Sequence, residues 1–326
     1  MASATTGPAG TAPRAAADVW LPIPADEIDG LPESLTYHHW DGDTDFPADP
    51  ADCAFYVVPY MKGPEVSVRP LRHMTGVRVV QTLTAGVDHV TPALPDLPRG
   101  ARLCNARGVH DASTAELALA LTLASLRRIP EFVRAQQDGE WRQAVHPALA
   151  DRTVLIVGYG SIGSAIEDRL VPFEVEEVLR VARTSRTTAR GGVHALTELP
   201  RLLPCADVVI LCTPLTADTR GLAGEDFLAR MKDGAVLVNV ARGGVVDTKA
   251  LLAELESGRL RAALDVTDPE PLPPGHPLWQ APGALISPHV GGATTALRPR
   301  AKRLLRRQLN LWAAGDPVGN VVAVAD

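Results

Sequence analysis

The chain has 326 residues, more than one ordinary domain, and its length predicts two domains. Hydrophobic residues make up 46% and charged residues 21%, so a sizeable core can form. The formal net charge of −6 argues against nucleic acid or an anionic membrane surface as the main partner.

The cysteines and the N-terminal segment indicate in which cellular compartment the protein is expected. Four cysteines lie scattered without C-x-x-C spacing, which predicts buried thiols of a reducing compartment and neither a disulfide framework nor a metal site: Cys53, Cys104, Cys205 and Cys212. Residues 1–16 lack large apolar groups and predict a disordered tail, not a secretory signal. No stretch approaches the ~20 apolar residues of a membrane span. We therefore expect a soluble, cytoplasmic protein.

The first third of the chain alternates short apolar runs with loops. Strands are predicted at residues 53–59, 77–83 and 101–106. A long helix is predicted over 111–129, because Asp and Ser/Thr stand at its start and arginines at its end. This helix is apolar nearly all round, so we expect it to be buried between domains or between subunits.

A second series of elements runs through the rest of the chain. Helices are predicted at 162–171, 249–257 and 300–314. Six strands, the number that a complete dinucleotide-binding sheet needs, are predicted at 153–158, 176–183, 206–214, 235–242, 260–266 and 283–288. The predicted fold class is α/β, with two doubly wound parallel-sheet domains. The first is a flavodoxin-like catalytic domain (1–104 and 290–326), and the second is a Rossmann dinucleotide-binding domain (105–289).

A glycine-rich turn follows the strand at 153–158. Its sequence "VGYGSIG" has G-x-G-x-x-G spacing, and the residues that we expect to hold the cofactor are Gly158, Tyr159, Gly160, Ser161, Ile162 and Gly163. Such glycines allow a tight turn, backbone approach to a pyrophosphate and close packing of helix on strand. Glycine also serves ordinary turns, but the strand before it and the helix after it favour a dinucleotide site.

The next strand ends in "VARTSR", where NAD enzymes usually carry an acid that binds the ribose 2′-hydroxyl. Arg183, Thr184 and Ser185 suit a 2′-phosphate instead, because guanidinium binds phosphate oxygens in pairs. The alternative is an exposed basic loop. The sequence thus favours NADP(H), with NAD(H) possible.

An arginine, an acid and a histidine follow three other predicted strands. Arg242, Glu270 and His289 each lie at the carboxyl end of a strand, the edge of an open α/β sheet where ligands bind. Each alone has an ordinary structural interpretation as a surface ion pair, a solvated acid or a structural histidine. Prolines around Glu270 exclude a helix there and predict that its backbone is held still.

From about residue 77 to 312 the chain resembles the D-isomer-specific 2-hydroxyacid dehydrogenase family. The motifs that carry the resemblance are "TLTAGVDHV", "VGYGSIG", "CTPLTADTRGL", "VNVARGGVVD", "ALDVTDPEP" and "SPHVGGAT". The segment "LDVTDPEPLPPGHPL" is similar to the glyoxylate/hydroxypyruvate reductase branch. The resemblance implies NAD(P)H-dependent reduction of a small 2-keto acid to the D-2-hydroxy acid.

The resemblance also implies roles for individual residues. Arg242 matches the arginine that binds the substrate carboxylate and keto oxygen, His289 matches the general acid/base, and Glu270 matches the carboxylate that orients this histidine. Asp265 matches the acid that holds the nicotinamide carboxamide. The turn of Ala85, Gly86 and Val87 matches the loop whose backbone N–H groups receive the substrate carboxylate. Cofactor contact is also implied for Cys212, Thr213 and Pro214.

Departures and alternatives accompany the resemblance. Cys212 stands where many relatives carry His, and Glu270 stands where formate-oxidising members carry Gln, which favours a 2-keto acid. Tyr60 and Met61 hint at an apolar pocket wall without defining the substrate side chain. The helix at 111–129 and the arm around 138–141 resemble the family's dimer contact and imply a homodimer. A non-catalytic NAD(P)-sensing protein or corepressor on the same fold is the alternative.

Overall fold

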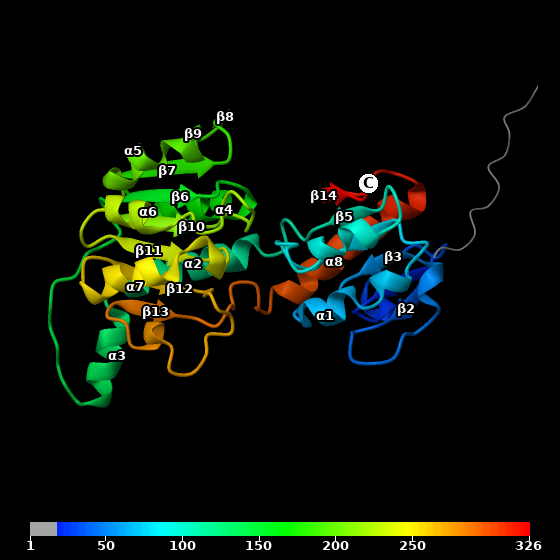
Figure 1. The fold of residues 1–326 in the computed structure, drawn as a ribbon, viewed down its shortest axis with the longest axis horizontal. Coiled ribbons are helices and arrows are strands. Elements are labelled where there is room, and N and C mark those ends of the chain that lie inside the picture. The colour runs from blue at the N-terminus through cyan, green and yellow to red at the C-terminus, as the bar shows by residue number, and fades with distance from the viewer. Residues whose placement is uncertain (1–17) are drawn as a thin grey trace, which may run out of the picture. The chain divides into compact units, whose positions relative to one another are not determined.

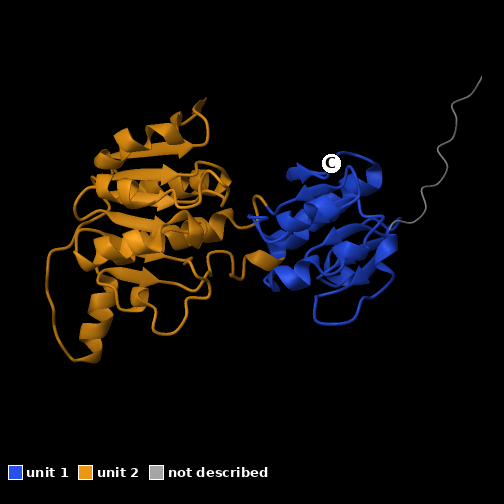
Figure 2. Ribbon diagram, viewed as in Figure 1, with its two compact units in different colours: residues 1–106, 299–326 blue, residues 107–298 orange. Residues whose placement is uncertain are grey.

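The computed structural model describes residues 18–326 and divides into two compact units. Unit 1 comprises the chain up to Ala106 together with Pro299–Asp326, and unit 2 comprises Arg107–Arg298 (Figure 2). The predicted domain boundaries were 104/105 and 289/290. The tail predicted for residues 1–16 lies outside the described residues.

Unit 1 is built on a six-stranded sheet in the order β14-β5-β4-β3-β1-β2 (Figure 1). All neighbours are parallel except β14, which pairs antiparallel with β5. The parallel part has the order 2-1-3-4-5 of flavodoxin-like sheets. Its strands are β1 (Asp18–Leu21), β2 (Thr36–His39), β3 (Cys53–Val57), β4 (Val79–Gln81), β5 (Arg102–Cys104) and β14 (Val321–Val324), and its helices are α1 (Gly63–Val68) and α8 (Leu297–Ala314).

The C-terminal segment is tied into unit 1 by a buried glutamine pair. Gln308 of α8 donates from Nε2 to Oε1 of Gln81 at 2.7 Å and to the carbonyl of Gly319 at 2.8 Å. Gln81 in turn donates to the carbonyl of Asn105 at 3.0 Å. Both side chains are buried, and the bond between them joins the C-terminal helix to β4.

Unit 2 is built on an eight-stranded sheet in the order β13-β12-β11-β10-β6-β7-β9-β8. Every pair is parallel except the hairpin of β8 and β9. The reversal of strand order at β6 is the switch point of a dinucleotide-binding fold. The strands are β6 (Thr153–Val157), β7 (Glu177–Ala182), β8 (Arg186–Thr188), β9 (Gly191–Ala195), β10 (Val208–Leu211), β11 (Val236–Asn239), β12 (Arg261–Leu264) and β13 (Ala284–Ile286).

The central strands of unit 2 are buried on both faces and separate two hydrophobic clusters. On β6, Leu155 and Val157 face one cluster, whereas Val154 and Ile156 face the other. This alternation follows from the two-residue period of a strand. One cluster includes side chains of α5 (Leu199–Leu202), α6 (Glu225–Arg230) and α7 (Thr248–Glu256), and the other includes those of α2 (Asp111–Leu126) and α4 (Ser161–Leu170). The predicted α/β class with two mostly parallel sheets is confirmed.

The long helix predicted over 111–129 is shorter in the structure. It ends at Leu126, Arg128 adopts a left-handed conformation with φ +55°, and α3 (Ile129–Gln137) begins directly afterwards. Pro130 explains the break, because its ring would clash with the carbonyl four residues earlier. Helix α2 packs within unit 2 against α4, β11 and β12.

Two further expectations can be compared with the structure. Cys53 and Cys104 are buried and Cys212 is partly so, but Cys205 is exposed, so the prediction of four buried thiols was wrong for Cys205. In the described part of the chain, no helix combines the length and apolar character needed to cross a membrane.

Candidate functional site

The residues singled out in unit 2 follow neighbouring parallel strands at the same edge of its sheet. Gly158 follows β6, Arg183 follows β7, and Cys212 follows β10. Arg242, Asp265 and His289 lie within three residues of the ends of β11, β12 and β13 respectively. Because parallel strands end at a common edge, the fold brings these segments together although they span more than 130 residues of sequence.

The glycine-rich turn has the shape that a bound pyrophosphate requires. Gly158 has φ +106°, and a Cβ added there would lie 2.6 Å from the backbone of Cys212 and Thr213. A Cβ on Gly163 would lie 2.9 Å from the carbonyl oxygen of Gly158. Gly160 is exposed, and a Cβ added there would meet no atom closer than the carbonyl oxygen of Gly158 at 4.0 Å, which leaves the start of α4 open to a phosphate.

The neighbouring turn after β10 faces the same region. Thr213 is buried, and its hydroxyl has no hydrogen-bond partner within the described residues. Cys212 donates from Sγ to the carbonyl of Gly158 at 3.2 Å, and Pro214 is exposed. A buried hydroxyl without a partner calls for a ligand atom or water, so these residues fit a dinucleotide at this edge.

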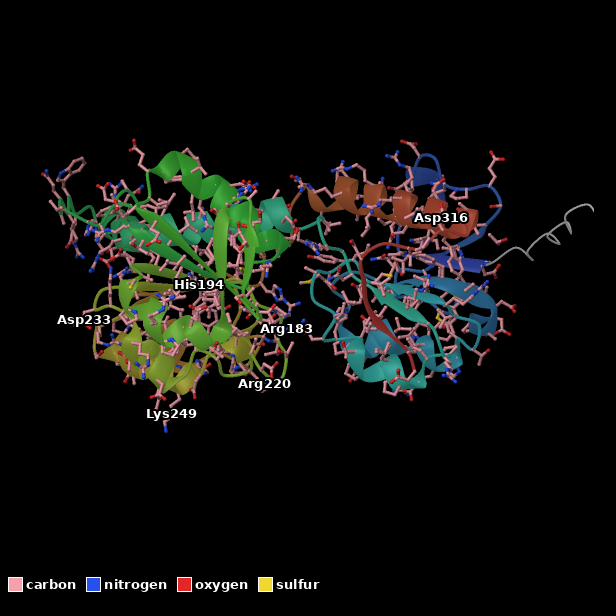
Figure 3. The ribbon with its side chains drawn as sticks, turned by 90° about the horizontal axis from the view of Figure 1, so that it is seen from above. Arg183, His194, Arg220, Asp233, Lys249 and Asp316 are labelled. Atoms are coloured by element: carbon pink, nitrogen blue, oxygen red, sulfur yellow. The ribbon has the colours of Figure 1, made fainter. Side chains whose placement is uncertain are left out.

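The loop after β7 presents cations and hydroxyls to solvent. Arg183, Thr184 and Ser185 are all exposed, and Arg183 projects from unit 2 where β7 ends (Figure 3). Arg183 forms no ion pair with any residue between 18 and 326. Its guanidinium is therefore available to an anionic ligand.

His289 and Glu270 are in direct contact. Nδ1 of His289 lies 2.5 Å from Oε1 of Glu270, and the two side chains are 34% and 39% exposed. Ion pairs this exposed contribute at most ~1 kcal/mol to stability. The contact therefore serves mainly to fix the imidazole, and it leaves Nε2 as the ring nitrogen that can meet a ligand.

Asp265 shapes the loop that carries His289. Its buried carboxylate accepts from Ser287 Oγ at 2.7 Å and from the backbone N–H groups of Val290 and Gly291 at 2.9 Å. Its carbonyl accepts from the N–H of His289 at 2.7 Å. Since an ionised carboxylate has roughly four acceptor positions, about one remains for a ligand donor.

Arg242 and Glu270 lie on segments that press against each other. Asn239 holds the backbone around Arg242, because its Oδ1 accepts from the N–H of Ala241 and its Nδ2 donates to the carbonyl of Arg242, both at 3.0 Å. Gly243 follows, and a Cβ there would lie 1.9 Å from the carbonyl oxygen of Thr267. A side chain at Gly243 would force apart the segments that carry the arginine and the acid.

Three predicted substrate residues belong to unit 1, and their role stays a prediction. Ala85, Gly86 and Val87 follow β4, and the turn is held by a bond from Asn105 Nδ2 to the carbonyl of Ala85 at 2.8 Å. Met61 is 59% exposed, with φ +60°. Among residues 18–326 there is no group of three His, Cys, Asp or Glu side chains that could hold a metal ion.

Comparison with known proteins identifies the family. Residues 119–291 match the family model of the D-isomer specific 2-hydroxyacid dehydrogenase NAD binding domain. The chain is 40% identical over 248 residues to a mouse glyoxylate reductase/hydroxypyruvate reductase, covering 74% of this chain and 75% of the mouse protein. The chain belongs to the D-isomer specific 2-hydroxyacid dehydrogenase family. It is an NAD(P)-dependent oxidoreductase.

Solved structures agree with this assignment. A D-isomer specific 2-hydroxyacid dehydrogenase from Xanthobacter autotrophicus in complex with NADPH and MES has a TM-score of 0.79 and 30% identity, covering 95% of this chain and 98% of that one. An NADPH-dependent glyoxylate/hydroxypyruvate reductase from Sinorhizobium meliloti in complex with NADP and sulfate has a TM-score of 0.78 and 25% identity, with the same coverage.

The sequence interpretation missed several residues that support this dehydrogenase site. Asn239 holds the backbone of the arginine loop, and Ser287 bonds to Asp265. Tyr159 was expected only as part of the glycine turn, yet its hydroxyl donates to the buried Glu167. An asparagine that ends a buried apolar strand is a visible signal for the first of these, because a buried amide needs partners. The contacts of Ser287 and Tyr159 become visible only in the folded structure, where a loop meets a neighbouring strand end and a turn meets the helix after it.

The tight contact at Gly243 generates a prediction for this dehydrogenase. Gly243→Ala should lower the free energy of unfolding by roughly 1–3 kcal/mol, because a backbone carbonyl cannot move aside as a flexible side chain can. The matched control is Gly192→Ala, where an added Cβ meets nothing within 4 Å. Denaturant titration measures both, and equal stability of the two variants would contradict the assigned contact.

Proposed function

We propose that this protein reduces a small 2-keto acid of the glyoxylate or hydroxypyruvate type to the D-2-hydroxy acid, with NADPH as the preferred reductant. The observation that carries the proposal is the 2.5 Å contact between His289 and Glu270 at the sheet edge that also bears the glycine-rich turn. The names of the mouse and Sinorhizobium relatives support the substrate class.

His289 acts as the proton donor. A nicotinamide cofactor held by the glycine-rich turn and Asp265 would supply hydride, and the keto oxygen of the substrate would then gain negative charge. Nε2 of a protonated His289 neutralises that charge by giving its proton, and on the reverse path it takes the proton back. Because an ordinary imidazole has a pKa near 6.5, it carries little proton at neutral pH without an anionic neighbour. Glu270 supplies that neighbour and fixes which nitrogen faces the substrate.

Arg242 binds and polarises the substrate. Its planar guanidinium can hold a carboxylate oxygen and the keto oxygen together, which positions the keto carbon for reduction. Loss of such an electrostatic group costs on the order of 10²–10³ in rate. Asp265 has room for about one further donor and suits the nicotinamide carboxamide.

The function is tested by turnover. Absorbance of the reduced nicotinamide is followed with glyoxylate, hydroxypyruvate and a bulkier 2-keto acid, each with NADPH and with NADH. We expect turnover of the two small acids with NADPH. Absence of turnover with every combination would favour the NAD(P)-sensing alternative.

Glu270 gives a prediction about the pH profile. Glu270→Gln removes the charge beside His289, so the protonated imidazole is less stable and reduction should decline at a lower pH than in the wild type. Asp268→Asn is the matched control, since Asp268 lies on the same loop and is exposed. Initial rates across pH give the readout, and a profile shared by wild type and both variants would refute the pairing.

Arg183 gives a prediction about cofactor choice. Arg183→Ala should weaken NADPH binding by about tenfold or more while NADH changes little, because only NADPH carries the 2′-phosphate. Arg201→Ala is the control, because Arg201 is an exposed arginine paired with Glu198 and lies outside this loop. Fluorescence titration gives both dissociation constants. Equal losses for the two cofactors would show that Arg183 does not contact the 2′-phosphate.

A homodimer completes the proposal. The arm after α3 exposes large apolar side chains, with Trp141 at 94% and Val145 at 101% of full exposure, and Val133 of α3 is 50% exposed. Such groups favour a partner surface, and most soluble oligomers are symmetric dimers. Light scattering should give twice the chain mass of 34.6 kDa. A single-chain mass would reject the dimer.

A further inference from the structure

A buried acid lies behind the glycine-rich turn and takes no part in the reaction described above. Glu167, on α4, has a side chain only 8% exposed. Its carboxylate accepts from Nε of Arg180 at 2.9 and 3.1 Å, from a second guanidinium nitrogen of Arg180, and from the hydroxyl of Tyr159. Burial acts to raise the pKa of Glu167, but the bonds from Arg180 and Tyr159 outweigh it and leave the pKa below its ordinary value.

Tyr159 is the residue between the first two glycines of the turn, and it is fixed at three points. Its hydroxyl donates to Glu167, and its N–H donates to the carbonyl of Val181 on β7 at 2.8 Å. Its carbonyl accepts from the guanidinium of Arg186 at the start of β8. The guanidinium of Arg180 also lies 5.9 Å from the centre of the tyrosine ring.

These contacts hold both ends of the loop proposed to bind the 2′-phosphate. Arg180 lies three residues before Arg183, and Arg186 directly follows Ser185. The loop 183–185 is therefore bounded by two arginines, and each of them is attached to the glycine turn through Tyr159 or Glu167.

Four arginines lie in or next to this loop, and two of them are paired with an acid. Arg180 is paired with Glu167, and Arg190 is paired with Asp168 and lies 3.8 Å from Glu167. Arg183 and Arg186 form no ion pair within residues 18–326. The two acids of α4 thus compensate the charges of Arg180 and Arg190 and leave uncompensated positive charge on Arg183 and Arg186, which flank the hydroxyls of the loop.

We propose that Tyr159, Glu167 and Arg180 form a clamp that fixes the distance between the pyrophosphate-binding turn and the 2′-phosphate-binding loop, with Glu167 as the positioning residue that favours NADPH over NADH. The proposal rests on the NADP preference proposed above. NADPH presents its pyrophosphate and its 2′-phosphate at a separation that the adenosine ribose restricts. A protein that holds both anion sites at that separation binds without ordering a loop, which NADH cannot exploit because it lacks the 2′-phosphate.

A purely structural role for the clamp makes a different prediction. A buried ion pair stabilises a fold weakly, but loss of one partner leaves an uncompensated charge and lowers stability. That loss would weaken both cofactors by the same factor. The ratio of the two dissociation constants therefore separates positioning from simple stabilisation.

The test compares three variants of the full chain by fluorescence titration with NADPH and with NADH, without substrate and without turnover. Glu167→Gln keeps the shape of the side chain but removes its charge, and we expect NADPH to bind about tenfold more weakly while NADH stays within about twofold. Tyr159→Phe removes only the hydroxyl, and we expect a smaller loss in the same direction. Glu177→Gln is the matched control, because it makes the same chemical change at an exposed position of β7, the strand that carries Arg180; its ratio should equal that of the wild type.

Each outcome has a separate meaning. A wild type that binds both cofactors equally overturns the NADP preference and the clamp together. A wild type that prefers NADPH, with an unchanged ratio in Glu167→Gln, overturns the clamp alone. Thermal unfolding shows whether Glu167→Gln is folded, and if it is not, an unchanged ratio in Tyr159→Phe overturns the clamp.

Discussion

The contact between the imidazole of His289 and the carboxylate of Glu270 is the interaction on which the candidate site described above depends. Neither residue sits on a strand or helix, so both must be held by the loops that carry them. Asp265 holds the histidine loop through four hydrogen bonds, and Gly243 lets the arginine loop pack against Thr267, three residues before Glu270. The positions of His289 and Glu270 are thus set by the buried carboxylate of Asp265 and by the absence of a side chain at Gly243, and not by groups proposed to bind the substrate.

The parallel sheet of unit 2 supplies the second constraint. Its central strands are buried on both faces, so polar groups can gather only where the strands end. One edge receives the glycine turn, the loop after β7 and the loops of Arg242 and His289. A dinucleotide that reaches from the loop after β7 at one side of the switch point to the histidine loop at the other would lie along this edge.

The sequence predicted the parts of the fold that rest on local patterns. Long apolar runs such as 153–158 and 235–242 became β6 and β11, because strands buried on both faces need continuous apolar residues. It missed β1, β2, β14 and the hairpin of β8 and β9, whose short segments are specified mainly by their neighbours in the sheet. Motifs pointed to Arg242, Glu270 and His289 as candidate site residues, and the structure shows the contact between His289 and Glu270. The contacts of Glu167 were not predicted, since its partner on β7 is placed beside α4 only by folding.

Two glutamates of unit 2, Glu270 and Glu167, lie in different environments. Glu270 is partly exposed and contacts the imidazole of His289, so its carboxylate lies at the surface of the unit beside a group that could exchange a proton with a ligand. Glu167 is buried and receives several hydrogen bonds, which hold it ionised and make it a fixed part of the scaffold. A buried acid next to the proposed phosphate site would repel the cofactor if its charge were uncompensated. Arg180 compensates that charge, so the acid can anchor the glycine-rich turn without opposing the phosphates that we propose for this region.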